Sequence, residues 1–358
     1  MAEFPERSAA GPARPARRAT IKDVAAEAGV SVAAVSKVVR SAYGVSPEMK
    51  SRVQAAIDKL GYRPDVGARA MRGHSYTIGV VAPELSSFFV TEVIDAIVSQ
   101  FEGTAYGVTV MLAGADADRQ RRAVHGLIDR KVDGLVLVAP WTPFRWIEKV
   151  ARSVPTVAVA RHGASQDCDT VVSDDEQGAR LAVDHLVGLG HRRIAHIGQA
   201  AGPDDSHPLS HVVRQRGYEA AMRAHGLEPD VIVGAYSDRG GYDAARTALA
   251  RAETPTAIFA GADVAALGAL RAIEDAGARV PGDISLVGYD NIWLAGVKRI
   301  WLTTVDESSQ LTGEAAARLL RERLDEGRTR AARHTLAPSL IVRGTTAPPP
   351  QGSRLPAD

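Results

Sequence analysis

Several features that define other classes of protein are missing from this sequence of 358 residues. Its single cysteine, Cys168, cannot form a disulfide within the chain, which excludes a disulfide-stabilised secreted fold. No apolar run reaches the roughly 20 residues of a membrane-spanning helix. Residues 1–19 lack the apolar core of a secretory signal peptide. We therefore expect a protein of a reducing compartment, the cytoplasm.

Catalytic motifs are missing as well. The sequence has no P-loop, no Gly-x-Ser-x-Gly nucleophile elbow and no cluster of residues at metal-ligand spacing. We therefore expect no enzymatic activity, no metal and no cofactor. The 45% hydrophobic and 24% charged residues are typical of a folded protein, and the length predicts two or three structural units.

Charge is distributed unevenly along the chain. Residues 1–73 hold 13 basic and 7 acidic residues, a net charge of +6, whereas the whole chain carries +1, so the remainder carries −5. This asymmetry predicts a basic head that binds a polyanion, attached to an acidic body. Residues 1–19 are predicted to be a disordered basic tail that either contacts phosphates or is only solvated. Residues 346–358 are predicted to be a second disordered tail.

Three short helices are predicted between residues 20 and 63. The first begins after the N-cap Thr20 and ends at Gly29, where a turn needs positive φ. The second begins after Ser31 and the third after Ser46, which precedes a proline. The spacing of the first two helices is that of a helix-turn-helix, with a generic three-helix corner as the alternative. Four valines would form the shared core: Val24, Val30, Val35 and Val38.

The second helix of such a unit enters the major groove of DNA. Lys37 can donate hydrogen bonds to guanine, and Val32 and Ala33 can make only apolar contacts, for example with a thymine methyl. Hydroxyl and arginine side chains nearby are better placed for phosphates. The predicted DNA contacts of the head are Thr20, Ser31, Val32, Ala33, Ser36, Lys37 and Arg40.

Together these residues resemble the LacI/GalR family of bacterial transcription regulators. The resemblance is carried by TIKDVAAEAGVSVAAVSKVV, beginning at Thr20, and by VSPEMKSRVQAAIDKLGYRPD, beginning at Val45, and it continues to about Arg343. It implies a helix-turn-helix domain at 20–63. It also implies a homodimer on a palindromic double-stranded DNA operator, controlled by a small-molecule effector such as a sugar or related metabolite.

The resemblance also implies that residues 64–75 are a hinge helix that orders on operator DNA. Met71 takes the place of a leucine that wedges between base pairs in relatives. Gly67 departs from the family and costs a helix about 1 kcal/mol relative to alanine, so we expect this hinge to depend strongly on DNA for its order. A plain linker is the alternative.

From residue 76 onward the pattern changes to alternating strands and helices, which is typical of a parallel α/β fold. The length favours two lobes, and the resemblance implies a periplasmic-binding-protein-like domain. We expect one lobe at 76–162 with 306–333 and the other at 163–305 with 334–345. The chain would then cross between the lobes near 161–163, 304–307 and 333–336.

Ligands of open α/β sheets bind beyond the carboxyl ends of the strands. Aromatic side chains there can stack on a sugar or a base, while Arg214 and Asp290 can make charge-assisted hydrogen bonds. The resemblance supports these two most strongly; each of the others has packing or capping as its alternative. The predicted effector contacts are Ser87, Phe88, Phe89, Trp141, Arg161, Arg214, Tyr236, Asp263 and Asp290.

Two departures from the family affect this cleft. Ala160 and Ala262 stand where relatives often carry an aspartate and an asparagine that bind polar effector groups. Their absence predicts a ligand with fewer hydroxyls than a free hexose, a different binding pose, or no small ligand. The leading interpretation is a ligand-controlled repressor. A solute-binding protein without a signal peptide is the alternative, which the head disfavours.

Overall fold

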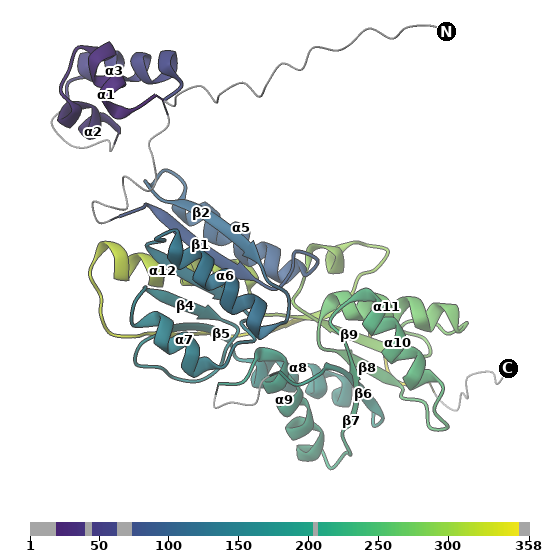
Figure 1. Cartoon of the computed structure of the whole chain (residues 1–358). Coiled ribbons are helices and arrows are strands. Elements are labelled where there is room, and N and C mark those ends of the chain that lie inside the picture. Colours follow the sequence, from purple (N-terminus) through teal and green to yellow (C-terminus); the bar gives the residue numbers. More distant parts are fainter. Residues whose placement is uncertain (1–18, 40–44, 63–73, 203–206, 351–358) are drawn as a thin grey trace, which may run out of the picture. The chain divides into compact units, whose positions relative to one another are not determined.

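The computed structural model describes residues 19–39, 45–62, 74–202 and 207–350, and the chain separates into two compact units at Ser75 and Tyr76 (Figure 1). The first unit contains the three predicted helices. They are α1 (Ile21–Ala28), α2 (Val32–Val39) and α3 (Pro47–Leu60). The basic tail, Arg40 and the hinge segment with Met71 lie outside the described residues.

Local sequence signals set the ends of these helices. Thr20 and Asp23 form a reciprocal capping box at the start of α1, and Ser46 caps α3 with Pro47 in its first turn. Gly29 ends α1 at φ 63° and Gly61 ends α3 at φ 57°, the left-handed conformation that glycine adopts without strain. The predicted helix boundaries are therefore confirmed.

The small core of this unit is apolar. Val24, Val35 and Val38 are buried together with alanines and Val53 of α3, and Val30 packs against them from the turn. The predicted helix-turn-helix core is confirmed, and α3 closes it from a third side.

The second unit contains two six-stranded sheets with corresponding strand orders, each the core of one lobe. The sheet of lobe 1 has the strand order β11-β5-β4-β3-β1-β2, and all its neighbours pair in parallel. Lobe 1 contains β1 (Thr77–Ala82), β2 (Gly107–Leu112), β3 (Gly134–Val138), β4 (Thr156–Val159), β5 (Asp169–Ser173) and β11 (Arg333–Leu336).

Helices cover both faces of this sheet (Figure 1). Residues of α5 and α12 form one apolar cluster with the central strands, and residues of α6 and α7 form another on the opposite face. The helices of lobe 1 are α5 (Phe88–Phe101), α6 (Ala117–Asp129), α7 (Phe144–Ala151) and α12 (Ser309–Asp325).

The sheet of lobe 2 has the strand order β12-β10-β9-β8-β6-β7, and only the β10–β12 pair is antiparallel. Its strands are β6 (Ile194–Gln199), β7 (Asp230–Gly234), β8 (Ala257–Ala260), β9 (Ser285–Tyr289), β10 (Thr303–Asp306) and β12 (Ser339–Ile341). The predicted parallel α/β architecture is thus confirmed, apart from this antiparallel edge.

The faces of this second sheet are also covered by helix pairs. Residues of α8 and α9 cover one face, and residues of α10 and α11 cover the other. The helices of lobe 2 are α8 (Asp175–Gly188), α9 (Ser210–Ala224), α10 (Asp238–Leu249), α11 (Asp263–Asp275) and the short 3-10 helix η1 (Trp293–Gly296).

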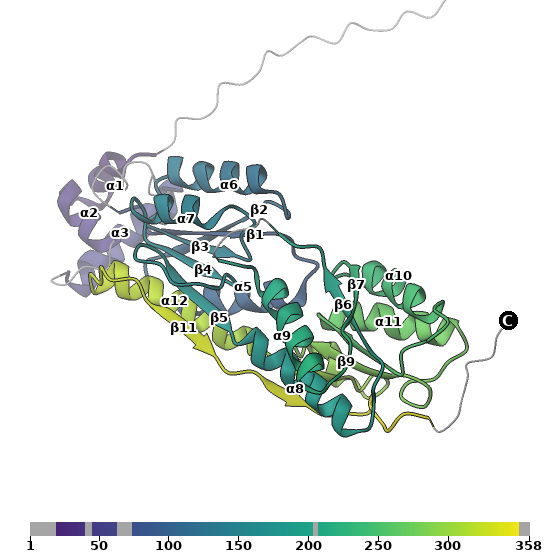
Figure 2. The same cartoon turned by 90° about the horizontal axis from the view of Figure 1, so that it is seen from below.

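One of the three crossings between the lobes lies well away from its expected position, and the other two lie at or directly after theirs. The first crossing was expected at 161–163, but β5 still belongs to lobe 1, so the chain crosses at Asp174. The second crossing is at Glu307–Ser308, between β10 and α12. The third follows β11, at Ala337–Pro338 (Figure 2). Lobe 1 therefore comprises residues 76–173 and 309–336.

The beginning of the expected C-terminal tail is ordered. His185 hydrogen-bonds to the hydroxyl of Thr346 at 2.9 Å, and the N–H of Ala347 donates to the hydroxyl of Ser285 at 3.0 Å. The prediction of a disordered tail from residue 346 is therefore wrong for these first residues, because side chains of lobe 2 hold them.

None of the helices in the described segments is both long enough and apolar enough to span a membrane.

Candidate functional site

The surface of α2 presents the side chains expected to meet DNA. Ser31, Val32, Ala33 and Lys37 are exposed, while Ser36 is half-buried. Among the described residues, Lys37 has neither a hydrogen bond nor an ion pair. Its ammonium group is therefore available to the acceptors of a base edge or a phosphate.

Two of the expected DNA contacts use their hydroxyls to start helices. The hydroxyl of Thr20 donates to Asp23 Oδ2 at 2.7 Å, and the N–H of Asp23 donates back to the hydroxyl at 3.4 Å. The hydroxyl of Ser31 accepts from the N–H of Ala34 at 3.1 Å. Both side chains therefore have a structural role that is independent of DNA.

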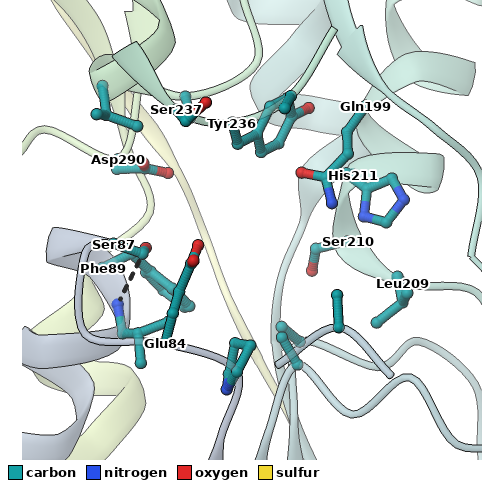
Figure 3. A pocket seen from close by; sticks show the side chains of 18 of the residues that line it. Glu84, Ser87, Phe89, Gln199, Leu209, Ser210, His211, Tyr236, Ser237 and Asp290 are labelled. Carbon is teal, nitrogen blue, oxygen red and sulfur yellow. Dashed lines mark hydrogen bonds between the residues drawn. The ribbon is translucent and has the colours of Figure 1, made fainter. Parts of the chain in front are cut away.

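A cavity of about 500 Å³ lies between the two lobes, at the carboxyl ends of their strands (Figure 3). Lobe 1 contributes the loops after β1, β2, β3 and β4 and the first turn of α5. Lobe 2 contributes the ends of β6 and β7, the first turns of α9 and α11, and the loop after β9. This is the place where two facing open α/β sheets bind ligands.

Six of the nine predicted effector contacts line this cavity. Most come from loops that follow strands, as expected, and Arg214 lies in the second turn of α9. Ser87 is the N-cap of α5, and its hydroxyl accepts from the N–H of Val90 at 3.5 Å. The six are Ser87, Phe89, Trp141, Arg214, Tyr236 and Asp290.

The other three do not line the cavity and are removed from the candidate contacts. Phe88 packs against the core of lobe 2 and lies edge-on to Trp293, with ring centroids 6.3 Å apart. Arg161 is fully buried and donates from Nη1 to the carbonyl of Pro140 at 2.9 Å. A position after a strand does not fix the direction of its side chain, and packing turns these two away.

Asp263 is also a structural residue. Its Oδ1 accepts from the hydroxyl of Thr304 at 2.6 Å, and its Oδ2 accepts from the N–H of Ile292 at 2.9 Å. Burial raises its pKa to about 7 despite these two hydrogen bonds. It joins α11 to β10 and to the loop after β9 instead of facing the cavity.

Arg214 is the electrostatic centre of the cleft. Its Nε and Nη2 donate to Oδ1 of Asp175 at 3.1 and 2.7 Å, and Nη1 donates to the carbonyl of Gly261. Its Nη2 also lies 3.5 Å from Oε2 of Glu307. The guanidinium carbon lies 3.4 Å from the centroid of the Tyr289 ring. The side chain is only 4% exposed, so nearly all its donors are already used within the protein.

The carboxyl groups around Arg214 differ in protonation. Burial would raise the pKa of Asp175, but Arg214 and His162 outweigh it, so its pKa lies below the ordinary value and the group is ionised. Burial raises the pKa of Asp290 to about 8 and raises that of Glu307 well above its ordinary value. The two carboxyl groups lie close enough to affect each other's pKa. At neutral pH this pair therefore holds a proton.

One wall of the cavity is aromatic. The rings of Trp141 and His211 stack with centroids 5.9 Å apart, and Tyr236 lies edge-on to His211 at 6.2 Å. His211 shares a hydrogen bond of 3.1 Å with the carbonyl of Ala200, and burial lowers its pKa to about 4, so the ring is neutral. Flat neutral rings at this wall can stack on a sugar or a heterocycle.

Sequence reasoning missed several polar residues of the cavity. Glu84 lies two residues after β1, where the same rule about strand ends applies, and that signal could have found it. Glu307 lies within the second crossing expected from the sequence, near 304–307, but it was not named as a contact. The missed polar side chains in the lining are Glu84, Gln199, Ser210, His211, Ser237 and Glu307.

Within the described part of the chain, no group of three or more His, Cys, Asp and Glu residues could hold a metal ion. Cys168 is buried, and burial raises the pKa of its thiol well above the ordinary value.

Comparison with known proteins links both units to one family. Residues 20–65 match the model described as "Bacterial regulatory proteins, lacI family", and residues 183–346 match a periplasmic binding protein-like domain. The chain is 34% identical to the ribose operon repressor of Escherichia coli K12, over 91% of this chain and 99% of that protein. It is 32% identical to catabolite control protein A of Priestia megaterium, over 84% and 91%.

Solved structures agree. The Lac repressor dimer bound to operator and the anti-inducer ONPF matches with a TM-score of 0.77 and 30% identity, over 92% of this chain and 100% of that chain. A LacI-family regulator from Enterococcus faecium with bound ribose matches with a TM-score of 0.67 and 26% identity, over 76% and 99%. The chain therefore belongs to the lacI family of bacterial regulatory proteins, and it is a DNA-binding transcription regulator, not an enzyme.

Proposed function

We propose that this regulator represses transcription as a homodimer on a two-fold symmetric operator, and that a small molecule in the cleft changes its affinity for DNA. The observation that carries the proposal is the position of Arg214. Its partner Asp175 directly follows the first crossing between the lobes, and its other partner, Glu307, lies in the second crossing.

A ligand in this cavity would touch the segments about which the lobes move. Glu307 lines the cavity itself, and so does Arg214. A ligand that bonds to either side chain changes the interactions of both crossings at once. Such a ligand binds one lobe arrangement better than another, which is the requirement for control of DNA binding from a distance.

The proposed operator contacts are those of α2. One recognition helix covers only half of an operator, so two copies of the chain are needed to read both halves. The proposed base contacts are Lys37, Val32 and Ala33, and hydroxyls nearby would contact phosphates. Because its target is chromosomal DNA, we place the protein in the cytoplasm.

Replacing Lys37 with alanine is expected to weaken specific operator binding by about 1–3 kcal/mol, the usual value of one good base contact. Binding to unrelated duplexes should change much less, because Lys37 would read a base and not only the phosphate charge. Fluorescence anisotropy with operator and scrambled duplexes at one salt concentration measures both affinities.

The control is Lys50→Ala, which removes the same charge from an exposed position on α3. It should leave the ratio of specific to non-specific affinity unchanged. If Lys37→Ala and Lys50→Ala lower that ratio equally, α2 is not the element that reads the bases.

Replacing Asp290 with asparagine is expected to weaken ligand binding by about 1–3 kcal/mol, the usual cost of leaving a buried hydrogen-bonding partner unsatisfied. The ligand is the hit of a thermal-shift screen of sugars, amino sugars and nucleosides, and its affinity is then measured by calorimetry. Operator binding without ligand should stay measurable, since Asp290 belongs to the second unit.

Asp129→Asn provides the matched control. Asp129 is exposed at the end of α6, outside the cavity lining. Equal affinities for the ligand in wild type and Asp290→Asn would remove Asp290 from the binding site.

A further inference from the structure

The acidic and basic side chains that line the cavity are unbalanced in number. Its described lining contains three carboxyl groups, those of Glu84, Asp290 and Glu307, and a single cationic group, that of Arg214. The ionised carboxylate of Asp175, directly bonded to Arg214, already compensates that positive charge. The lining therefore offers a ligand no unpaired cation.

The acidic groups are placed to meet a ligand. Figure 3 shows the carboxyl groups of Glu84 and Asp290 directed into the open space of the cavity. Glu84 is exposed and has no ion pair or hydrogen bond among the described residues. Asp290 is 9% exposed and Glu307 is 4% exposed, and both line the cavity. The cavity thus has an acidic buried end and a second acid nearer to solvent.

The remaining lining does not offset this charge. His211 is neutral, and one of its ring nitrogens hydrogen-bonds to the carbonyl of Ala200. Ala160 and Ala262 add only methyl groups. The Trp141 ring, in contrast, has an electron-rich face of the kind that attracts cations. An ammonium group placed beside the Asp290–Glu307 pair would favour the ionised form of these carboxyl groups and offset the cost of burying their charge, whereas a phosphate or carboxylate would find no unpaired cation there.

We propose that the ligand carries a protonated amino group, as an amino sugar or a related hydroxylated amine does, and that the Asp290–Glu307 pair binds this group. Glu84 adds attraction from the solvent side, and Trp141 covers the apolar face of the ligand. This inference rests on the proposed function, because it assumes that the cavity binds the effector. It adds that the cavity does not bind anionic metabolites, including sugar phosphates.

The test uses sets of related sugars in which a neutral hydroxyl-bearing group is replaced by an amine or by a carboxylate. Full-length protein near pH 7, where an amino group of this kind is mostly protonated, is titrated by calorimetry with glucose, glucosamine and glucuronate. The corresponding galactose and mannose sets follow, with ribose, glucose 6-phosphate and putrescine added. We expect an amine to bind at least about tenfold more tightly than its neutral counterpart, and no binding of the anions.

A variant separates this charge effect from general affinity. Glu84→Gln should weaken the amine about two- to fivefold, as expected for one partly exposed charge pair, and should leave any neutral sugar unchanged. Glu253→Gln removes the same charge from an exposed position after α10 and should change neither.

The outcomes distinguish the two proposals. If a neutral or anionic sugar binds more tightly than every amine, the inference about the amino group is overturned while ligand control stands. If no compound of any charge binds, the cavity is not an effector site for this range of metabolites, and the proposed ligand control is contradicted together with the inference.

Discussion

Replacement of Asp169 by alanine is expected to lower the free energy of unfolding by about 3–5 kcal/mol, the usual cost of leaving the partner of a buried ion pair alone. Asp169 is completely buried at the start of β5. Arg323 donates to its two oxygens at 2.7 and 3.0 Å, Arg328 at 2.8 and 3.0 Å, and the N–H of Ala332 at 2.7 Å. Without it, Arg323 loses its counter-ion and Arg328 keeps only Glu322, at 2.9 Å.

The pKa of Asp169 also predicts how the stability of the fold changes with pH. Burial alone would raise the pKa of Asp169, but the two arginines and the N–H of Ala332 outweigh it, so its pKa lies below the ordinary value. A carboxyl group with a lowered pKa stabilises the fold above its unfolded pKa of about 3.9 and loses this contribution as the pH falls further. Asp169→Asn should therefore flatten the acid side of the stability curve.

Urea unfolding followed by circular dichroism measures both effects. The control is Asp167→Ala, which breaks an ion pair of 2.9 Å with Arg152 whose side chains are 28% and 68% exposed. That surface pair should contribute less than about 1 kcal/mol. Equal losses for the two variants would show that the buried cluster does not stabilise lobe 1.

Replacement of Arg214 by alanine is expected to have an effect of similar size, again about 3–5 kcal/mol. The sequence suggests a ligand contact whose loss would abolish ligand binding alone. In the structure the same guanidinium neutralises Asp175 and bonds to Glu307, so its removal leaves buried carboxyl groups without a partner. Loss of ligand binding in Arg214→Ala would thus report loss of cleft structure as well as of a contact.

A double-mutant cycle isolates the interaction. Arg214→Ala and Asp175→Ala should each destabilise the protein, and the double variant should lose less than the sum by about 0.5–3 kcal/mol, because the two side chains contact each other. The exposed pair of Arg239 and Asp243, at 2.7 Å and 83% and 54% exposed, serves as the control cycle with a coupling below about 0.5 kcal/mol. Additive losses for Arg214 and Asp175 would contradict the assignment of Arg214 as the centre of the cleft.

The parts of the fold that could be predicted are those with local signals. The caps Thr20 and Ser46 and the left-handed Gly29 mark helix ends within one turn of the chain. The first strand, β1, is a run of six apolar or small residues, and it begins where the strand–helix pattern was predicted to begin, directly after residue 76.

Strand β5 is an element that local sequence signals do not predict. It has five residues and starts with an aspartate, which reads as a polar loop. Asp169 is tolerated there only because Arg323, 154 positions later, pairs with it. That dependence on distant residues is why the first crossing was placed too early.

For the site, the sequence predicted several positions that line the cavity but not the directions of the side chains. Strand ends located Ser87, Phe89, Trp141, Tyr236 and Asp290 in the cavity, because the topology of parallel sheets gathers such positions at one edge. Side-chain direction was not predictable, which is why Phe88 and Arg161 were misassigned. The acidic character of the cavity depends on which groups are paired, and only the structure gives the pairing of Arg214.

The central claim, that this is a sequence-specific DNA-binding dimer, is tested most directly by selection of random duplexes with the full-length protein, followed by DNase footprinting of the enriched sequence. We expect an inverted repeat protected over both halves, with affinity that falls steeply as salt rises. Enrichment of no sequence, or protection of a single unrepeated site, would contradict the account.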